Sequence, residues 1–142
     1  MSVHLVKLCV GVDSVDDLRN WQEQYLKNLK IRKVKPEVIH VTRQMPKREE
    51  ELLDGGSLYW VIKGHIAVRQ RILELRTVVK NGAPHCGIVL DQELVRTLHR
   101  FRSPFQGWRY LKVEDAPPDV SDVQGGDMPD ALKIELAELG LL

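Results

Sequence analysis

One stretch, from Asp54 to Gly64, constrains the fold of this chain more than any other. Two adjacent glycines, Gly55 and Gly56, open into a run of aromatic and β-branched residues, Ser57 to Lys63, which a further glycine closes. Such residues favour a pleated, half-buried surface, and glycine adopts the positive φ angles that tight turns require. The stretch is therefore predicted to be a central strand between two sharp chain reversals, with the other elements packed around it.

The remaining elements are predicted from hydrophobic periodicity and turn residues. Strands are expected at 3–12, 38–43, 85–90 and 93–98, with an ordered loop and a short closing strand within 100–111. A short helix is expected at 46–53 and a longer one at 15–30. Ser14 is the expected N-cap of the longer helix, with Asp17 in the capping-box position. Three-to-four spacing fits Trp21 and Tyr25, or alternatively Gln22 and Leu26, and we place Trp21 and Tyr25 on the inner face.

Residues 65–79 are the ambiguous segment. Apolar residues follow one alternation up to Ile72 and the opposite one from Leu73 onward. Such a change of phase indicates either a bulged, bent strand or a helix that runs into a strand. We favour the bent strand because β-branched residues dominate the second half, and Asn81-Gly82 is typical of the turn that follows.

The order of these elements predicts an α+β fold rather than alternating βαβ units. We expect a curled, mostly antiparallel sheet with two or three helices, and more specifically a partly open barrel. Residues 1–119 are predicted to form a single α+β domain. Residues 120–142 are predicted to be an acidic C-terminal tail with a short helix at 129–139.

Charge is distributed unevenly along the 142 residues, although the net charge is only +1. Residues 41–112 hold thirteen Lys and Arg against seven Asp and Glu, whereas residues 113–142 hold one against eight. This asymmetry fits a basic binding face and an acidic segment able to fold back on it. No apolar run approaches the roughly 20 residues of a membrane span, and no secretion signal is visible, so a cytoplasmic location is expected. Cys9 and Cys86 are then expected to be reduced, buried thiols.

Four stretches resemble one known family. They are 45–48, with the sequence MPKR; 52–64, with LLDGGSLYWVIKG; 69–73, with RQRIL; and 104–111, with PFQGWRYL. They are similar to the domain of unknown function 1489 family, which consists of short bacterial proteins without an assigned activity. The resemblance runs from the first strand to about Asp119 and is less clear beyond it. A more distant similarity, resting on strand order and the central strand, is to PUA-like small barrels, which include RNA-binding modules.

No catalytic or metal-binding motif is apparent. The five histidines lie at 4, 40, 65, 85 and 99, without the spacing of a zinc site. Gly55-Gly56-Ser57 precedes a strand, whereas a phosphate-binding loop precedes a helix. No metal, cofactor or catalytic residue is therefore predicted, and enzymatic activity is not the favoured interpretation.

The remaining constellation is basic and aromatic. Several cations placed along a groove neutralise phosphates, and unpaired bases stack on aromatic rings. The leading hypothesis is therefore a nucleic-acid-binding module, RNA in particular, that uses an Arg-rich aromatic face. The alternatives are a protein-interaction module without catalysis, and an enzyme or small-ligand-binding domain of unknown reaction. The predicted binding residues are Arg43, Lys47, Arg48, Lys63, Arg69, Arg71, Arg96, Arg100, Arg102, Trp108, Arg109 and Tyr110.

Overall fold

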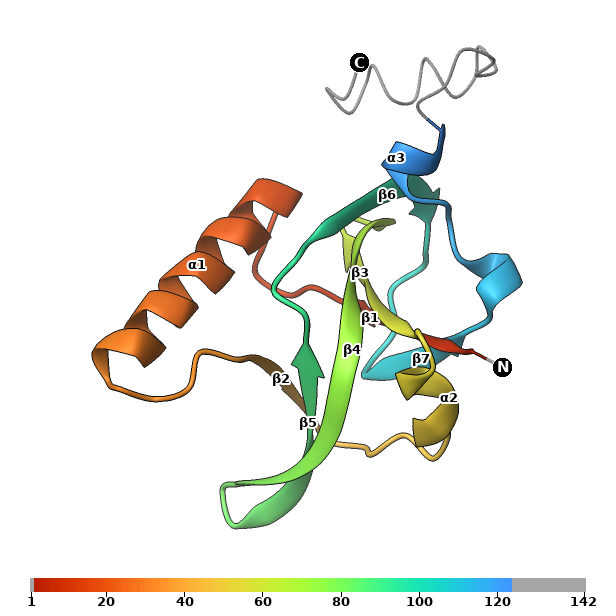
Figure 1. Ribbon diagram of the computed structural model, residues 1–142. Helices are drawn as coiled ribbons and strands as arrows, with labels where there is room; N and C mark the ends of the chain where they lie inside the picture. Colours follow the sequence, from red (N-terminus) through yellow and green to blue (C-terminus); the bar gives the residue numbers. More distant parts are fainter. Residues whose placement is uncertain (1, 124–142) are drawn as a thin grey trace.

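The computed structural model describes residues 2–123 and contains a seven-stranded mixed sheet with one long helix and shorter helical segments around it (Figure 1). The strands are β1 (His4–Leu8), β2 (Val38–Thr42), β3 (Ser57–Ile62), β4 (His65–Lys80), β5 (Ala83–Leu90), β6 (Val95–Phe101) and β7 (Trp108–Leu111). The helices are α1 (Val15–Ile31), α2 (Glu49–Leu53) and α3 (Val120–Val123), with a 3-10 turn, η1 (Val113–Asp115). The predicted α+β class is confirmed.

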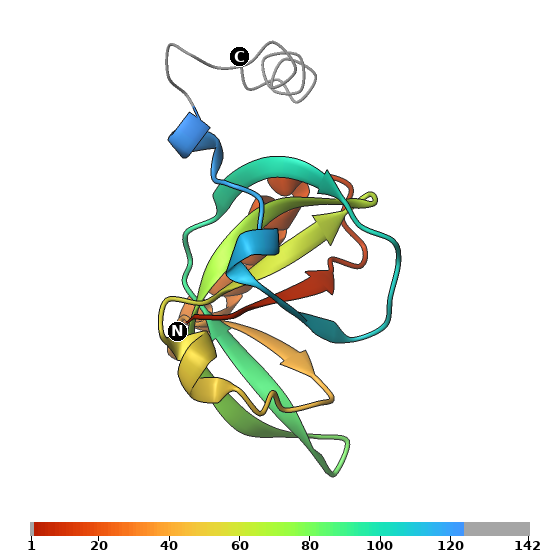
Figure 2. The same cartoon turned by 90° about the vertical axis from the view of Figure 1, so that its right-hand side faces the viewer.

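The sheet is open and strongly bent along β4. Its strand order is β2-β5-β4-β3-β1-β7, with β6 paired to β4 outside this path. Only β1 and β3 run parallel; the other pairs are antiparallel. The first half of β4 pairs with β3 and β6, and its second half pairs with β5, so β4 connects two parts of the sheet that face different directions (Figure 2).

The ambiguous segment is the bent strand. β4 is continuous over 16 residues, and its pairing register shifts between Ile66 and Val68 and again between Ile72 and Glu74. The second shift lies where the apolar alternation changes phase in the sequence. A bulge adds a residue on one strand and bends it, so the phase change in the sequence marks the place where β4 bends.

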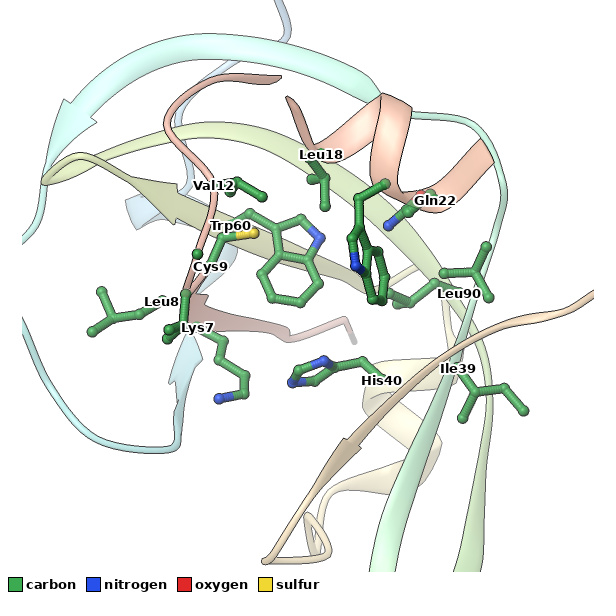
Figure 3. A pocket seen from close by; sticks show the side chains of 14 residues that line it. Lys7, Leu8, Cys9, Val12, Leu18, Gln22, Ile39, His40, Trp60 and Leu90 are labelled. Carbon is green, nitrogen blue, oxygen red and sulfur yellow. The ribbon is translucent and has the colours of Figure 1, made fainter. Parts of the chain in front are cut away.

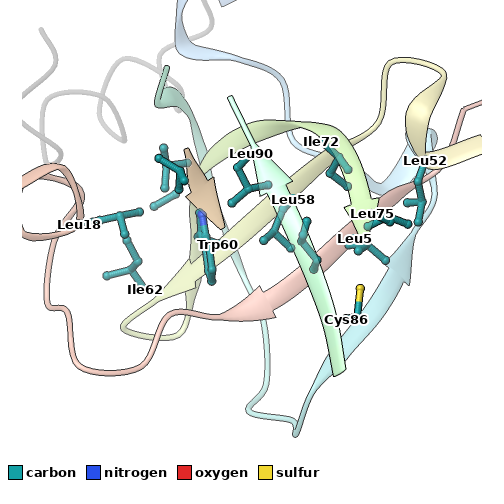
Figure 4. Close-up of a cluster of buried hydrophobic side chains, with 14 of the residues drawn as sticks. Leu5, Leu18, Leu52, Leu58, Trp60, Ile62, Ile72, Leu75, Cys86 and Leu90 are labelled. Atoms are coloured by element: carbon teal, nitrogen blue, oxygen red, sulfur yellow. The ribbon is translucent and has the colours of Figure 1, made fainter. Parts of the chain in front are cut away.

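The predicted central strand is β3, and it is buried along its whole length rather than half-buried. Leu58, Trp60 and Ile62 face the larger core, which extends from Leu18 of α1 to Leu52 of α2 (Figure 4). Tyr59 and Val61 face a smaller cluster on the other side of the sheet, which Phe105 and Ala116 cover. Because neighbouring residues of a strand point to opposite faces, a strand that is buried on both faces reads as one continuous apolar run.

The N-terminus of α1 is capped as predicted, but the residue on its inner face differs from the prediction. The Asp17 amide donates to the Ser14 hydroxyl at 3.1 Å, and the Asp17 carboxylate accepts from the Asp13 amide. Trp21, however, is 58% exposed, whereas Gln22 is only 5% exposed. The prediction that Trp21 lies on the inner face is wrong, because Gln22 fills that position and bonds to a buried partner, Gln70.

The end of the described chain packs against β6. Asp119 forms a bridge with Thr97, the Leu98 amide donates to the Pro118 carbonyl, and Val120 is buried. The helix predicted at 129–139 lies outside the described residues. No helix within residues 2–123 is long and apolar enough to cross a membrane.

Candidate functional site

Several of the predicted binding residues gather around the edge strand β7. We call this group the β7 cluster; its members are Arg43, Lys47, Arg48, Arg102, Trp108, Arg109 and Tyr110. β7 lies at one end of the sheet and pairs only with β1 among the described strands (Figure 2). Its alternating residues divide the cluster into two sides, because Trp108 and Tyr110 point to the face opposite to that of Arg109.

On one side of β7, two aromatic residues hold the segment between β2 and α2. The Trp108 Nε1–H donates to the Gln44 carbonyl at 2.8 Å, and the Tyr110 hydroxyl accepts from the amides of Lys47 and Arg48. The Arg48 guanidinium lies 5.2 Å from the Tyr110 ring centre and also pairs with Glu51. The two aromatic residues therefore position the exposed Arg43 and Lys47, and their own polar atoms are already bonded.

On the other side of β7, two arginines share one aromatic ring. The guanidinium groups of Arg102 and Arg109 lie 5.2 Å and 5.3 Å from the centre of the Phe105 ring. Arg109 also donates to the carbonyls of Gln106 and Trp108. Within residues 2–123, neither guanidinium is paired with a carboxylate. Two positive charges without a carboxylate partner among the described residues therefore lie near the Phe105 ring.

The other predicted residues lie on β4, β6 and the turn between β3 and β4, and three of them are already engaged. Arg69 donates to both carboxylate oxygens of Asp119, at 2.8 Å and 2.7 Å, and to the Ser57 hydroxyl. Arg96 pairs with Asp16 at 2.9 Å, and Arg100 donates to the Asp115 carbonyl. Lys63 is in the β3–β4 turn, and Arg71 shares a hollow with Arg69, Asp91, Glu93 and Asp119.

The structure also contains a pocket that the sequence did not reveal. It has a volume of about 350 Å³ and lies between the end of β1, the first turns of α1, and β2 (Figure 3). The walls are mostly apolar and include Leu18, Trp21, Trp60 and Leu90. Lys7 and His40 are its ionisable lining residues besides the Cys9 thiol. None of the pocket's lining residues was among the predicted binding residues.

Burial changes the ionisation of the polar groups in this pocket. It lowers the pKa of His40 from 6.5 to about 4, and the neighbouring charges of Lys7 and Lys80 act in the same direction. Burial also lowers the pKa of Lys7, and it raises the pKa of the Cys9 thiol to about 11. At neutral pH, His40 is therefore neutral and the Cys9 thiol is protonated.

Comparison with known families identifies the chain. The sequence profile of a family described as a protein of unknown function (DUF1489) matches residues 5–142. This chain belongs to the DUF1489 family. The match confirms the resemblance seen in the sequence and extends past Asp119, where that resemblance became less clear. No curated protein and no solved structure matches this DUF1489 chain, so the PUA-like similarity stays a prediction.

Residues 2–123 hold no group of three or more His, Cys, Asp or Glu side chains placed to bind a metal ion. Burial raises the pKa of the Cys86 thiol to about 11, so it is not a thiolate at neutral pH. The stacked rings of His65 and His99, 5.7 Å apart, have no described thiol or hydroxyl nucleophile bonded to them.

The low pKa of His40 gives a testable pH dependence. Between about pH 6.5 and pH 4 the unfolded chain binds a proton at His40 that the folded protein does not, so the free energy of unfolding falls as the pH falls. The loss is roughly 3 kcal/mol at most, since one pKa unit corresponds to about 1.36 kcal/mol. Urea unfolding at several pH values is expected to show a shallower dependence for His40→Phe, which retains a ring against Trp60. If the free energy of unfolding depends on pH in the same way in the wild type and in His40→Phe, this prediction is contradicted.

Proposed function

We propose that this protein binds single-stranded nucleic acid, RNA in particular, at the β7 cluster. One observation carries the proposal: Arg102 and Arg109 lie over the same Phe105 ring without a carboxylate partner among residues 2–123. Arginine offers a planar fork that matches phosphate oxygens, and it also stacks on bases. An edge strand leaves room for an extended ligand beside it.

The electrostatics of this spot favour an anionic ligand. Two guanidinium groups near one ring make the local potential positive, and phosphate groups that accept hydrogen bonds from them would neutralise it. By contrast, Asp119 already neutralises Arg69 and Asp16 neutralises Arg96. Binding at either of those sites would first require an ion pair to break. The favoured contacts are therefore Arg102 and Arg109, with Arg43 and Lys47 on the other side of β7.

The test is fluorescence anisotropy with labelled single-stranded RNA, single-stranded DNA and a duplex, at about 50 and 200 mM salt. Binding is expected to weaken steeply between these salt concentrations. The double variant Arg102→Ala with Arg109→Ala is expected to lose about tenfold in affinity and to show a smaller salt dependence, by about 0.7 in slope for each lost phosphate contact. The matched control is Lys27→Ala with Lys30→Ala, which removes two charges from α1, away from β7 (Figure 1).

The outcomes separate this proposal from its alternatives. The proposal would be overturned if none of the three nucleic acids binds. It would also be overturned if the β7 double variant and the α1 control lose the same affinity. A protein partner is the second candidate, because Phe101 is 69% exposed next to Arg102. Association through an apolar patch responds little to salt, so a salt-insensitive partner that is lost in Phe101→Ser would favour a protein-interaction role.

A further inference from the structure

The pocket between β1, α1 and β2 contains two polar groups that lack a partner. The His40 Nε2 atom is buried and has no hydrogen-bond partner, the single such side-chain atom within residues 2–123. Lys7 is partly buried at the same pocket and has no carboxylate partner among the described residues. Buried polar groups are almost always bonded, and an orphaned one requires an explanation.

The fold places these two groups together at one side of an aromatic wall. Lys7 pairs in register with Trp60 of β3 on one side and with Trp108 of β7 on the other. The His40 ring meets the Trp60 indole edge to face, with ring centres 5.0 Å apart. Figure 3 shows the Lys7 and His40 side chains extending toward each other below the Trp60 indole. The Lys7 ammonium and an imidazole that carries the unpartnered Nε2 atom therefore approach each other where the apolar wall ends.

We propose that this pocket binds a small monocarboxylate with a flat apolar body. The carboxylate accepts hydrogen bonds from the Lys7 ammonium and the His40 Nε2–H, and the apolar body lies among Trp60, Leu18 and Leu90. The volume of about 350 Å³ is within the range of about 300–1,000 Å³ that small-molecule sites occupy.

Charge balance selects the carboxylate over other ligands. Lys7 supplies one positive charge and neutral His40 supplies none, so one negative charge is balanced. A phosphate dianion would carry an uncompensated charge into an apolar pocket, and an uncharged nucleobase would leave the ammonium unpaired. This inference is independent of the proposed nucleic-acid binding, which uses the exposed β7 cluster.

The experiment is isothermal titration calorimetry on the full chain with three probes. They are 2-naphthoate, its neutral analogue 2-naphthamide, and acetate, which has the charge without the apolar body. We expect 2-naphthoate to bind at least about tenfold more tightly than either of the others. The amide loses the charge-assisted hydrogen bond and acetate loses the buried rings, and each loss is expected to weaken the affinity by more than about tenfold. Equal affinity for the acid and the amide would overturn the proposal, as would no binding of 2-naphthoate at about millimolar concentration.

Variants assign the effect to the two donors. Lys7→Met keeps the length and apolar character of the side chain, so it is expected to fold and to weaken 2-naphthoate binding at least about tenfold. His40→Leu is expected to weaken it as well, and His40→Gln, which retains a donor, less so. Lys112→Met removes an exposed lysine outside the pocket and serves as the control.

The proposal fails if Lys7→Met and Lys112→Met bind 2-naphthoate with the same affinity. It also fails if uridine binds to the wild type as tightly as 2-naphthoate. Nucleic-acid affinity of Lys7→Met, measured in parallel, tests the β7 cluster separately.

Discussion

Gly56→Ala is expected to leave little or no folded protein. A Cβ atom at this position would lie 2.4 Å from the Leu52 carbonyl oxygen and 2.4 Å from the Val3 carbonyl oxygen. Both atoms belong to the backbone, so no side-chain rotation relieves the contact. Gly56 also donates from its amide to the Leu52 carbonyl, and its carbonyl accepts from the Ile72 amide. Moving the chain away from the clash would therefore break the connection between α2, β3 and β4.

The matched control is Gly82→Ala, at the tip of the β4–β5 hairpin. Gly82 has a positive φ of 77°, but nothing lies within 4 Å of a Cβ placed there. The expected cost is that of a left-handed backbone for alanine, about 1–2 kcal/mol. Soluble yield and thermal unfolding followed by circular dichroism compare the two variants. If Gly56→Ala has a melting temperature close to that of the wild type, the backbone at α2 shifts to accept the Cβ atom and the prediction is wrong.

Local chemistry explains which parts of the fold could be predicted. Asn81-Gly82 adopts positive φ angles of 53° and 77°, as its sequence indicated. Lys63-Gly64 does the same at 50° and 80°, which makes a second tight hairpin, between β3 and β4. The Ser14 cap and the bend in β4 were likewise visible, because each depends on residues close together in the chain.

The inner face of α1 could not be predicted in the same way. Local hydrophobicity favours Trp21 over Gln22 at a buried position. Gln22 is buried because Gln70, 48 residues later, supplies two reciprocal hydrogen bonds at 2.9 Å. Trp21 instead stacks on Tyr25 at the surface, with ring centres 5.5 Å apart, and lines the pocket. A long-range polar pair thus overrides the apolar period of the helix.

The candidate sites show the same limit. The sequence indicated the basic and aromatic residues near β7, because they lie within short stretches of the chain. It did not separate the two sides of β7 or reveal that Asp119 pairs with Arg69. The pocket was not predicted at all, because Lys7, His40 and Trp60 come from three strands. A lysine within an apolar strand was the available signal, since a charged residue at position 7 interrupts the apolar run.

Gln70→Leu is expected to be the most destabilising substitution of a core polar residue. Gln70 is completely buried and all of its bonding capacity is used. Its Oε1 accepts from the Trp60 Nε1–H and from Gln22, and its Nε2 donates to Gln22 and to the Asp91 carbonyl, each at 2.9 Å. Leucine fills a similar volume but leaves these partners buried without bonds. An unsatisfied buried group costs about 1–3 kcal/mol, so a total of about 4 kcal/mol is expected.

A double-mutant cycle with Gln22→Leu distinguishes polar bonding from packing. Gln22→Leu alone leaves Gln70 bonded to Trp60 and Asp91, so we expect a smaller loss, of about 2 kcal/mol. In the double variant the amide of Gln22 is no longer orphaned, and leucine at both positions adds apolar contact beside α1. The combined loss, measured by urea unfolding, is therefore expected to be less than the sum of the two single losses, with a coupling of about 1 kcal/mol or more. Strictly additive losses would mean that the two glutamines stabilise α1 through packing alone and that their hydrogen bonds contribute nothing net.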